Sequence, residues 1–351
     1  MQYEIDYIPV GTGEKGGDAI ALRYGDFSDP MKQNVVVIDG GTKDSGKLLV
    51  EHIKEHYSAS HIDLIVASHL HMDHISGLTE VLENFTVGKL AVHCPWEHTQ
   101  AIKKMTHTSS TLGRLETKLE KSLSGLSTLV DLAASKKVPI IQPFQGEKLL
   151  EGVFVLGPAK DYYQQLLANF GATPQVKEEH RIEKVISFAK ETAAWIAEAM
   201  HIETLSDDHA DTDAENNSSL ILLAIFDNKK FLFTGDAGKG ALTKAIEFAD
   251  SIQPDLLLSV DFFDVPHHGS KRNLGPSILN KLMPKKAFIC CPPKGDPKHP
   301  SRKVINALLR RDCKVHTNKS GFTLCHRSDN APARSGWGAA TPESFFDQVE
   351  E

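Results

Sequence analysis

The sequence predicts an α/β fold in which strands and helices alternate around one large core or two smaller ones. The chain has 351 residues, of which 40% are hydrophobic and 24% are charged, as in an ordinary globular protein. Short apolar runs rich in β-branched residues alternate with longer segments whose apolar residues recur at helical spacing. Together these features indicate a soluble globular protein.

The sequence shows no export signal that we recognise. The N-terminal residues 1–6 lack a basic segment followed by an apolar one, and no apolar run approaches the ~18 residues that a membrane span needs. The five cysteines are odd in number and show no C-x-x-C spacing. We therefore expect no membrane partner, reduced thiols and a cytoplasmic location.

Strands dominate the N-terminal half in this interpretation. Apolar runs predict strands at residues 3–10, 19–24, 34–41, 64–67, 90–95, 138–141 and 152–158, and helical spacing covers 47–57, 75–82, 98–136 and 160–200. We interpret 98–136 as a helical insertion that could form a lid over the site or dock a protein partner. The glycine-rich stretch 11–17 lacks the Lys-Ser/Thr ending of a P-loop and precedes a strand, so a phosphate cradle is disfavoured there.

The alternation continues in the C-terminal half. Residues 201–215 are acidic and polar and predict a flexible loop. Two strands, 216–226 and 230–236, are expected to form a hairpin. Further strands are predicted at 260–266, 287–291, 315–317 and 321–324, with a helix over 303–311. We interpret residues 327–351 as a tail with a mobile acidic end. We therefore predict that the remaining residues, 1–326, form one domain.

The motif His-x-His-x-Asp-His follows the predicted strand at 64–67 directly. It places four potential metal ligands within six residues: His69, His71, Asp73 and His74. Neutral imidazole and carboxylate are ligands that divalent cations accept. Clustering four titratable groups also requires something that compensates them. In extended backbone His69 and His71 project to one side, whereas the adjacent Asp73 and His74 cannot both do so, so one loop can serve two ions.

This motif resembles the signature of the metallo-β-lactamase superfamily, whose fold is an αββα sandwich with a dinuclear metal site at one edge. The resemblance implies two divalent metal ions, Zn²⁺ or Mn²⁺. Asp39, at the end of a predicted strand, matches the superfamily's buried acid that orients the metal-site loop. Asp236, at the end of another, matches the carboxylate that bridges the two ions.

Two adjacent histidines follow the predicted strand at 260–266, and one of them matches the superfamily's last metal ligand. Because neighbouring side chains diverge, we predict that His267 binds metal and that His268 faces the substrate as a catalytic hydrogen-bond donor or acid, with the reverse order left open. Lys271 and Arg272 follow at once and are predicted to contact a phosphate oxygen. In the transition state Lys271 or Arg272 would stabilise the developing charge.

Further residues complete the predicted site. Asn216 and Asn217 stand where the superfamily's third histidine usually falls, so an amide or a water would fill that position of the first metal site. Ser270 and His299 are predicted to lie near the substrate, although His299 could equally cap its own loop.

The order of these motifs is similar to that of the extracellular nuclease domain of ComEC-type DNA-uptake proteins and their stand-alone relatives, over roughly residues 3–326. The resemblance implies a phosphodiesterase or nuclease that uses a metal-bound hydroxide, with Asp73 orienting the nucleophile while it binds the second ion. We expect a phosphate-ester substrate, nucleic acid included. The alternatives are a small-substrate esterase or lactonase resembling phosphorylcholine esterase and, less favoured, a non-catalytic partner-binding protein.

Charge is unevenly distributed along the chain. The net charge is −7, which argues against a general polyanion binder, but residues 267–319 contain 13 Lys or Arg against 2 Asp or Glu. Such a basic window could attract a phosphate-bearing substrate, or its lysines could simply be solvated on surface helices.

Overall fold

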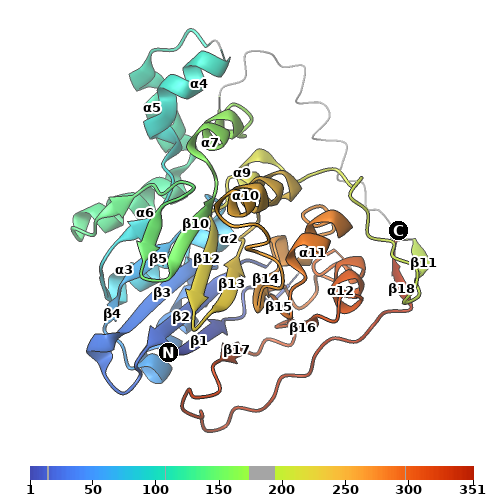
Figure 1. Cartoon of the computed structure of the whole chain (residues 1–351). Coiled ribbons are helices and arrows are strands. Elements are labelled where there is room, and N and C mark those ends of the chain that lie inside the picture. Colours follow the sequence, from blue (N-terminus) through green and yellow to red (C-terminus); the bar gives the residue numbers. More distant parts are fainter. Residues whose placement is uncertain (14–15, 107, 174–193, 297) are drawn as a thin grey trace.

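In a computed structural model, which describes residues 1–13, 16–106, 108–173, 194–296 and 298–351, two seven-stranded sheets pack face to face with helices on both outer sides (Figure 1). The first sheet has the order β17-β1-β2-β3-β5-β7-β8. Its strands are β1 (Gln2–Tyr7), β2 (Ala19–Gly25), β3 (Gln33–Gly40), β5 (Leu64–Val66), β7 (Leu90–Ala91), β8 (Ile140–Ile141) and β17 (Leu324–Arg327).

The second sheet has the order β16-β15-β14-β13-β12-β10-β9. Its strands are β9 (Lys148–Leu150), β10 (Val153–Gly157), β12 (Ile221–Phe226), β13 (Lys229–Phe233), β14 (Phe262–Asp264), β15 (Lys286–Ile289) and β16 (Lys314–Thr317). Two small pairs lie outside the sheets: β4 (His61–Ile62) with β6 (Thr86–Val87), and β11 (Trp195–Ala197) with β18 (Gln348–Glu350).

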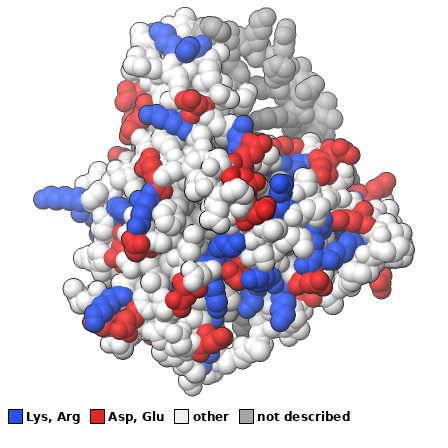
Figure 2. All heavy atoms as spheres, viewed as in Figure 1, with Lys and Arg blue, Asp and Glu red and all other residues white. Residues whose placement is uncertain are grey.

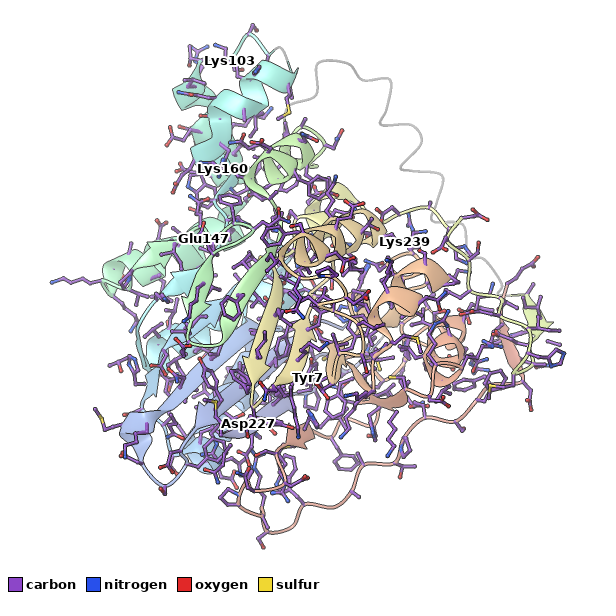
Figure 3. The ribbon with its side chains drawn as sticks, in the orientation of Figure 1. Tyr7, Lys103, Glu147, Lys160, Asp227 and Lys239 are labelled. Carbon is purple, nitrogen blue, oxygen red and sulfur yellow. The ribbon has the colours of Figure 1, made fainter. Side chains whose placement is uncertain are left out.

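Two hydrophobic cores hold these layers together. Between the sheets, Tyr7 of β1 packs its ring 5.9 Å from Phe262 of β14 and 5.4 Å from Phe288 of β15 (Tyr7 is labelled in Figure 3). Helices α1 (Lys43–His52) and α3 (Leu78–Asn84) pack on the first sheet. Helices α10 (Lys239–Ile252), α11 (Pro276–Leu282) and α12 (Arg302–Leu309) bury a second core against the other sheet. The predicted αββα sandwich is therefore confirmed.

The predicted hairpin is also confirmed. Strands β12 and β13 pair antiparallel, with Phe226 opposite Lys229. The two turn residues, Asp227 and Asn228, have φ angles of 51° and 58°, as a two-residue turn between twisted strands requires. The strand begins at Ile221, later than predicted, because 214–217 forms the short helix α9 (Ala214–Asn217), which the Asp213 side chain caps.

The insertion is helical, as expected. It contains η3 (Pro95–His98), α4 (Thr99–Thr106), α5 (Leu112–Ser122) and α6 (Ser124–Ser135). Figure 1 shows α4 and α5 standing away from the sheets, while α6 lies beside α3. Of the helix predicted over 160–200, α7 (Lys160–Leu167) is present, 195–197 is the strand β11 instead, and 174–193 lie outside the described residues.

Two segments predicted to be mobile are held in place. In the acidic loop at 201–215, the Asp207 carboxylate accepts hydrogen bonds from the backbone and side chain of Ser277, and Asp211 accepts from the backbone N–H groups of Lys239 and Gly240. In the tail, β18 pairs with β11, and the backbone of Phe346 exchanges two hydrogen bonds with Asn306. The expectation of free segments is wrong because polar partners on α10, α11 and α12 fix both, whereas the domain boundary at 326 stays a prediction.

The remaining short elements are η1 (Pro30–Lys32), η2 (Ile53–Tyr57), α2 (Met72–Ile75) and η6 (His267–Gly269). Across the described residues, none of the helices is both long enough and apolar enough to cross a lipid bilayer.

Candidate metal centre

The site lies where strands of both sheets end at a common edge. Strand β3 runs parallel to β5, and β13 runs parallel to β14, so each pair delivers its carboxyl-terminal residues to one end of its sheet. Asp39 is the penultimate residue of β3, the His-x-His-x-Asp-His loop follows β5, Asp236 follows β13, and the adjacent histidines follow β14. Strand β2 is antiparallel to β3, so residues that precede β2 reach the same edge.

The motif loop divides its ligands between two groups. His69 lies in a bend after β5, His71 has extended backbone at the N-cap of α2, and Asp73 and His74 lie in the first turn of α2. One group contains His69 and His71 with Asp236, and another contains Asp73 and His74 with His268; within each group the candidate ligand atoms lie within 4.8 Å of one another. The loop therefore contributes candidate ligands to both groups.

Asp236 stands between the two groups. Its Oδ1 atom lies 3.4 Å from His74 Nε2, and its Oδ2 atom lies 3.7 Å from His69 Nε2. The preceding Gly235 has φ +50°, and a Cβ there would lie 2.8 Å from Ser68 Oγ, so only glycine lets β13 turn this closely beside the motif loop. Each carboxylate oxygen thus faces a different set of histidines.

The adjacent histidines point to different places because both have left-handed backbone, with φ angles of 50° and 55°. His268 joins the group with Asp73 and His74. His267 Nε2 lies 3.7 Å from Asp236 Oδ2, and its ring centroid is 5.1 Å from that of His299. The geometry therefore favours the reverse of the predicted order, and both ligand assignments remain proposals.

Hydrogen bonds fix how these two histidines are held. The Nδ1 atom of His268 is 2.9 Å from the carbonyl oxygen of Cys290, which can only accept, so this nitrogen carries the proton. Asn273 donates its amide N–H groups to the carbonyl oxygens of Asp236 and Ala237, which leaves its Oδ1 atom to accept from His267 Nδ1 at 3.0 Å. In the neutral form of each ring, Nε2 then keeps its lone pair.

Asp39 orients the opposite side of the site. Its carboxylate accepts hydrogen bonds from the backbone N–H and the hydroxyl of Ser68 and lies 2.8 Å from His74 Nδ1. These contacts place the Nε2 atom of His74 toward Asp236. Burial raises the pKa of Asp39, and its charge interaction and hydrogen bond with His74 oppose that rise. Asp39 thus has the position that the resemblance implies.

Asp18 is a buried carboxylate that sequence reasoning missed. It lies 3.5 Å from His268 Nδ1 and 3.8 Å from His74 Nδ1. The sequence feature that could have identified Asp18 is the pair of glycines directly before an acid and a strand. A Cβ at Gly17 would lie 1.9 Å from the carbonyl oxygen of Asp73, so this glycine is needed for the close approach of the two loops.

Burial and nearby charges set the protonation of the site. Burial alone would lower the pKa of His268, but the charges of Asp18 and Asp236 outweigh it and raise that pKa to about 9. Burial lowers the pKa of His69 well below its usual range, and the charge of His74 adds to this. Burial alone would raise the pKa of Asp236, yet the positive charge of His74 holds it well below the ordinary carboxyl value.

The donor set fits divalent cations. The Nε2 atom of His74 and the Oδ1 atom of Asp236 are buried without a hydrogen-bond partner among the described residues. The ring nitrogens His69 Nε2 and His71 Nδ1 face each other at 3.0 Å. Such atoms are compensated when they share a cation, and imidazole and carboxylate suit zinc or manganese.

The two amides of α9 have different surroundings. The side-chain oxygen of Asn216 is buried with no hydrogen-bond partner in the described part of the chain, while its amide nitrogen donates to Thr212 Oγ1. The side-chain oxygen of Asn217 instead accepts from the backbone N–H of Ala241 on α10. Asn217 therefore fixes α9 against α10, and Asn216 is the amide with a free acceptor.

A pocket of about 560 Å³ opens beside the ligands. Its lining comprises residues from both sheet edges: Gly16, Thr42, Met72, Asp73, Ser76, His267, His268, Pro292 and His299. His299 is thus in the pocket, with Nδ1 3.1 Å from the carbonyl oxygen of His267. Burial, reinforced by the charges of His268 and His267, lowers the pKa of His299 to about 3.

Three predicted substrate-binding residues do not line this pocket. Lys271 Nζ donates to the carbonyl oxygen of Glu351, and Arg272 donates to those of Ala210 and Asp211. The Ser270 hydroxyl accepts from the backbone N–H of Arg272. These side chains hold the neighbouring loop and the last strand, so their position gives no support to the predicted phosphate contacts.

Known proteins similar to this chain cover different parts of it. ComE operon protein 3 of Bacillus subtilis (strain 168) is 28% identical over 162 residues, which are 43% of this chain and 20% of that protein, so the match spans a fifth of this relative's length. A mutant of the β-hydroxylase CmlA aligns with 93% of this chain and 54% of its own, at 13% identity and a TM-score of 0.45. A diphosphatase from the PhnP family aligns with 93% of this chain and 98% of its own, at 14% identity and a TM-score of 0.42. Residues 32–292 match the family profile described as Metallo-beta-lactamase superfamily, and because this is well over half of the chain, the protein belongs to the metallo-β-lactamase superfamily.

Proposed function

We propose that this protein hydrolyses phosphodiester bonds with two divalent cations, zinc or manganese. The observation that carries the proposal is the position of Asp236, whose two oxygens face separate ligand groups from one loop. A carboxylate shared in this way suits a pair of cations, the arrangement common in phosphatases and nucleases.

Each ligand group has an assigned role. His69, His71 and Asp236 would hold the first ion, with the Asn216 oxygen or a water near it, and Asp73, His74 and His268 would hold the second. When bound, the ions would supply Lewis acidity toward a phosphoryl oxygen and a nucleophilic water at neutral pH. Asp39 and Asp18 keep the histidines in place for this task.

Residues of the pocket would bind and orient the substrate. His267 is held by Asn273, and His299 is held by the carbonyl oxygen of His267. The lowered pKa of His299 keeps this ring neutral at pH 7, so its Nε2 atom can accept a hydrogen bond from a substrate hydroxyl or a water. Asp73 lines the same pocket, where it can orient the attacking water.

A nucleic acid is the natural substrate that we favour. The order of motifs resembles a ComEC-type nuclease domain, and the similarity to ComE operon protein 3 supports this branch.

All five cysteines are free, which supports the cytoplasmic location predicted from the sequence.

A second candidate is an esterase or lactonase for small substrates. The observation that favours it is the pocket lining, which contains no Lys or Arg among the described residues and encloses about 560 Å³. A pocket of this size admits a small ester whole. Salt separates the two activities, because binding of a polynucleotide weakens steeply as salt rises and binding of a neutral ester does not.

The proposal is tested with Asp73→Ala and His71→Ala. Both variants and the wild type are assayed with Mn²⁺ on single-stranded DNA, RNA, bis-p-nitrophenyl phosphate and a lactone. Asp44→Ala and His61→Ala are matched controls, because these side chains are exposed and belong to none of the candidate ligand groups. We expect phosphodiester hydrolysis that only the site variants lose; undiminished activity in either of them, or hydrolysis of the lactone alone, contradicts the proposal. A preparation that binds no metal after reconstitution would favour a non-catalytic role.

A further inference from the structure

A row of basic side chains follows one face of α5 in the insertion. Arg114, Lys118 and Lys121 are exposed and, at 100° per residue, fall within an arc of about 60°. The buried side chains of this helix, Leu115 and Leu119, lie on another face. The helix's two acids, Glu116 and Glu120, lie on the side roughly opposite the row, so the row is uniformly positive. We call these three residues the α5 row.

The α5 row lines a depression of about 470 Å³ together with small residues. The other lining residues are Gly113, Thr117 and Ser122, whose side chains leave the cations open to a ligand. Figure 2 shows basic side chains at the end of the molecule that the insertion forms, and Figure 3 labels Lys103 at its tip. Successive members of the row are separated by about 6 and 4.5 Å along the helix axis.

The α5 row differs from the basic window at 267–319 in its partners. In that window many cations are already held by acids: Lys285 by Asp261, Arg302 by Asp296, Arg310 by Glu198, Arg311 by Glu203 and Lys319 by Glu343. No side chain of the α5 row makes an ion pair or hydrogen bond with another described residue. The insertion therefore carries unpaired positive charge that the sequence analysis does not identify.

The helix that follows the α5 row contacts a residue of the pocket wall. Helix α5 ends at Ser122, and α6 begins at Ser124. At Gly125 the chain presses so closely on Met72 that a Cβ would lie 2.0 Å from the Met72 sulfur. Met72 lines the pocket beside Asp73. The basic row thus ends four residues from a contact with the pocket wall.

We propose that the α5 row binds the phosphate backbone of a single-stranded nucleic acid while one of its phosphodiester bonds occupies the pocket. This inference rests on the proposed function and specifies its substrate class. A single row of three cations matches one backbone, and a pocket of about 560 Å³ admits a nucleotide but not a duplex. A protein partner fits less well, because Leu112 is the one large apolar side chain exposed among the described residues of the insertion.

The test measures binding separately from hydrolysis. Fluorescence anisotropy of fluorescein-labelled dT12 and rU12 is recorded in EDTA over a range of NaCl concentrations. The variant combines Arg114→Gln, Lys118→Gln and Lys121→Gln. Its matched control combines Lys43→Gln, Lys47→Gln and Lys54→Gln, which remove the same charge from exposed positions on α1 and η2.

We expect the row variant to lose about tenfold or more in affinity for both oligomers. The slope of log affinity against log salt should fall by about 2, because three phosphate contacts contribute roughly 0.7 each on single strands. The control should keep the wild-type slope. With Mn²⁺ present, the row variant should show a raised KM for the oligomers and an unchanged kcat/KM for bis-p-nitrophenyl phosphate.

Equal slopes for the row and control variants, or tighter binding of a dA12·dT12 duplex than of dT12, overturn the inference. If only the difference in salt slope between the row and control variants is missing, the binding role of the α5 row is refuted. If the wild type binds dT12 but hydrolyses no phosphodiester, the proposed function is refuted instead.

Discussion

Two buried clusters of charge in this protein can be compared directly. At the candidate metal centre, the carboxylates of Asp18, Asp39 and Asp236 make ion contacts with histidines alone among the described residues. In the second cluster, behind β1, the carboxylates of Glu4 and Asp6 each lie 2.8 Å from Arg334, and Arg23 lies 2.7 Å from Glu4. Both sets of acids are buried, but only the second has guanidinium partners.

The difference shows that buried acids can form either a ligand-binding site or a structural ion-pair cluster. Guanidinium is always charged, so the Glu4 and Asp6 carboxylates are balanced within the chain and tie the segment at 334 to β1. Histidine can release its proton when it binds a cation, and the buried carboxylates of the candidate metal centre would then be balanced by that cation. The permanence of the partner's charge therefore decides what the cluster does.

The sharpest test of this contrast compares Asp236→Asn with Asp6→Asn. Asp236→Asn should lower phosphodiesterase kcat by at least about a thousandfold, more than the 10–100-fold typical of residues that only support ligands. Asp6→Asn should leave kcat nearly unchanged below its unfolding temperature. Steady-state kinetics on bis-p-nitrophenyl phosphate measure both, and a similar loss in the two variants would remove the distinction between the clusters.

Arg334→Ala should show the opposite pattern. Removing this guanidinium leaves Glu4 and Asp6 buried with less positive charge, which should lower the free energy of unfolding by about 3–5 kcal/mol. Urea denaturation measures the loss, and metal content should not change. Arg334→Lys keeps the charge and is expected to lose less free energy of unfolding. If the alanine variant is as stable as the wild type, the second cluster has no structural role.

Asp18→Asn probes the support of the metal centre. Asp18 contacts His268 and His74, so we expect metal affinity or kcat to fall by about 10–100-fold with little change in unfolding. Equilibrium dialysis and kinetics measure the two quantities, with the exposed Asp44→Asn as the control. An Asp18→Asn variant indistinguishable from that control would show that this carboxylate does not orient the histidines.

The smallest expected effect is the acid sensitivity of the second cluster. Burial alone would raise the pKa of Asp6, but hydrogen bonds to His52 and Arg334 and their charges lower it well below the ordinary value. A lowered folded-state pKa stabilises the protein above the unfolded pKa of about 3.9, and this stabilisation is lost as pH falls further. The melting temperature of the wild type should therefore drop more steeply between pH 5 and pH 2.5 than that of Asp6→Asn, and parallel curves would contradict this.

Sequence reasoning located most residues of the candidate site where they sit at strand ends. His69 to His74, Asp39 and Asp236 follow recognisable apolar strands, and parallel strands bring their carboxyl ends together. Asp18 was missed because it precedes a strand, and only the antiparallel pairing of β2 with β3 carries it to the same edge. The order of His267 and His268 depends on two left-handed φ angles that no sequence period reveals.

Long-range polar contacts account for the other differences between the sequence-based predictions and the structure. The acidic loop and the tail look mobile in sequence because they lack apolar periodicity, yet Asp211 and Arg334 fix them through partners far along the chain. The basic window at 267–319 suggested a phosphate-binding surface, but several of its cations pair with acids that are distant in sequence, such as Glu198 and Glu343. Such pairings depend on the folded arrangement and have no local signal.

The most direct test of the central claim is the metal content of the purified protein. After dialysis against Mn²⁺ or Zn²⁺ and removal of free ion, inductively coupled plasma mass spectrometry should find close to two ions per wild-type chain. The Asp236→Asn variant should bind fewer, and Arg334→Ala should bind as many as the wild type. A wild type that retains no divalent ion under these conditions would contradict the account that the buried acids and histidines form a metal centre.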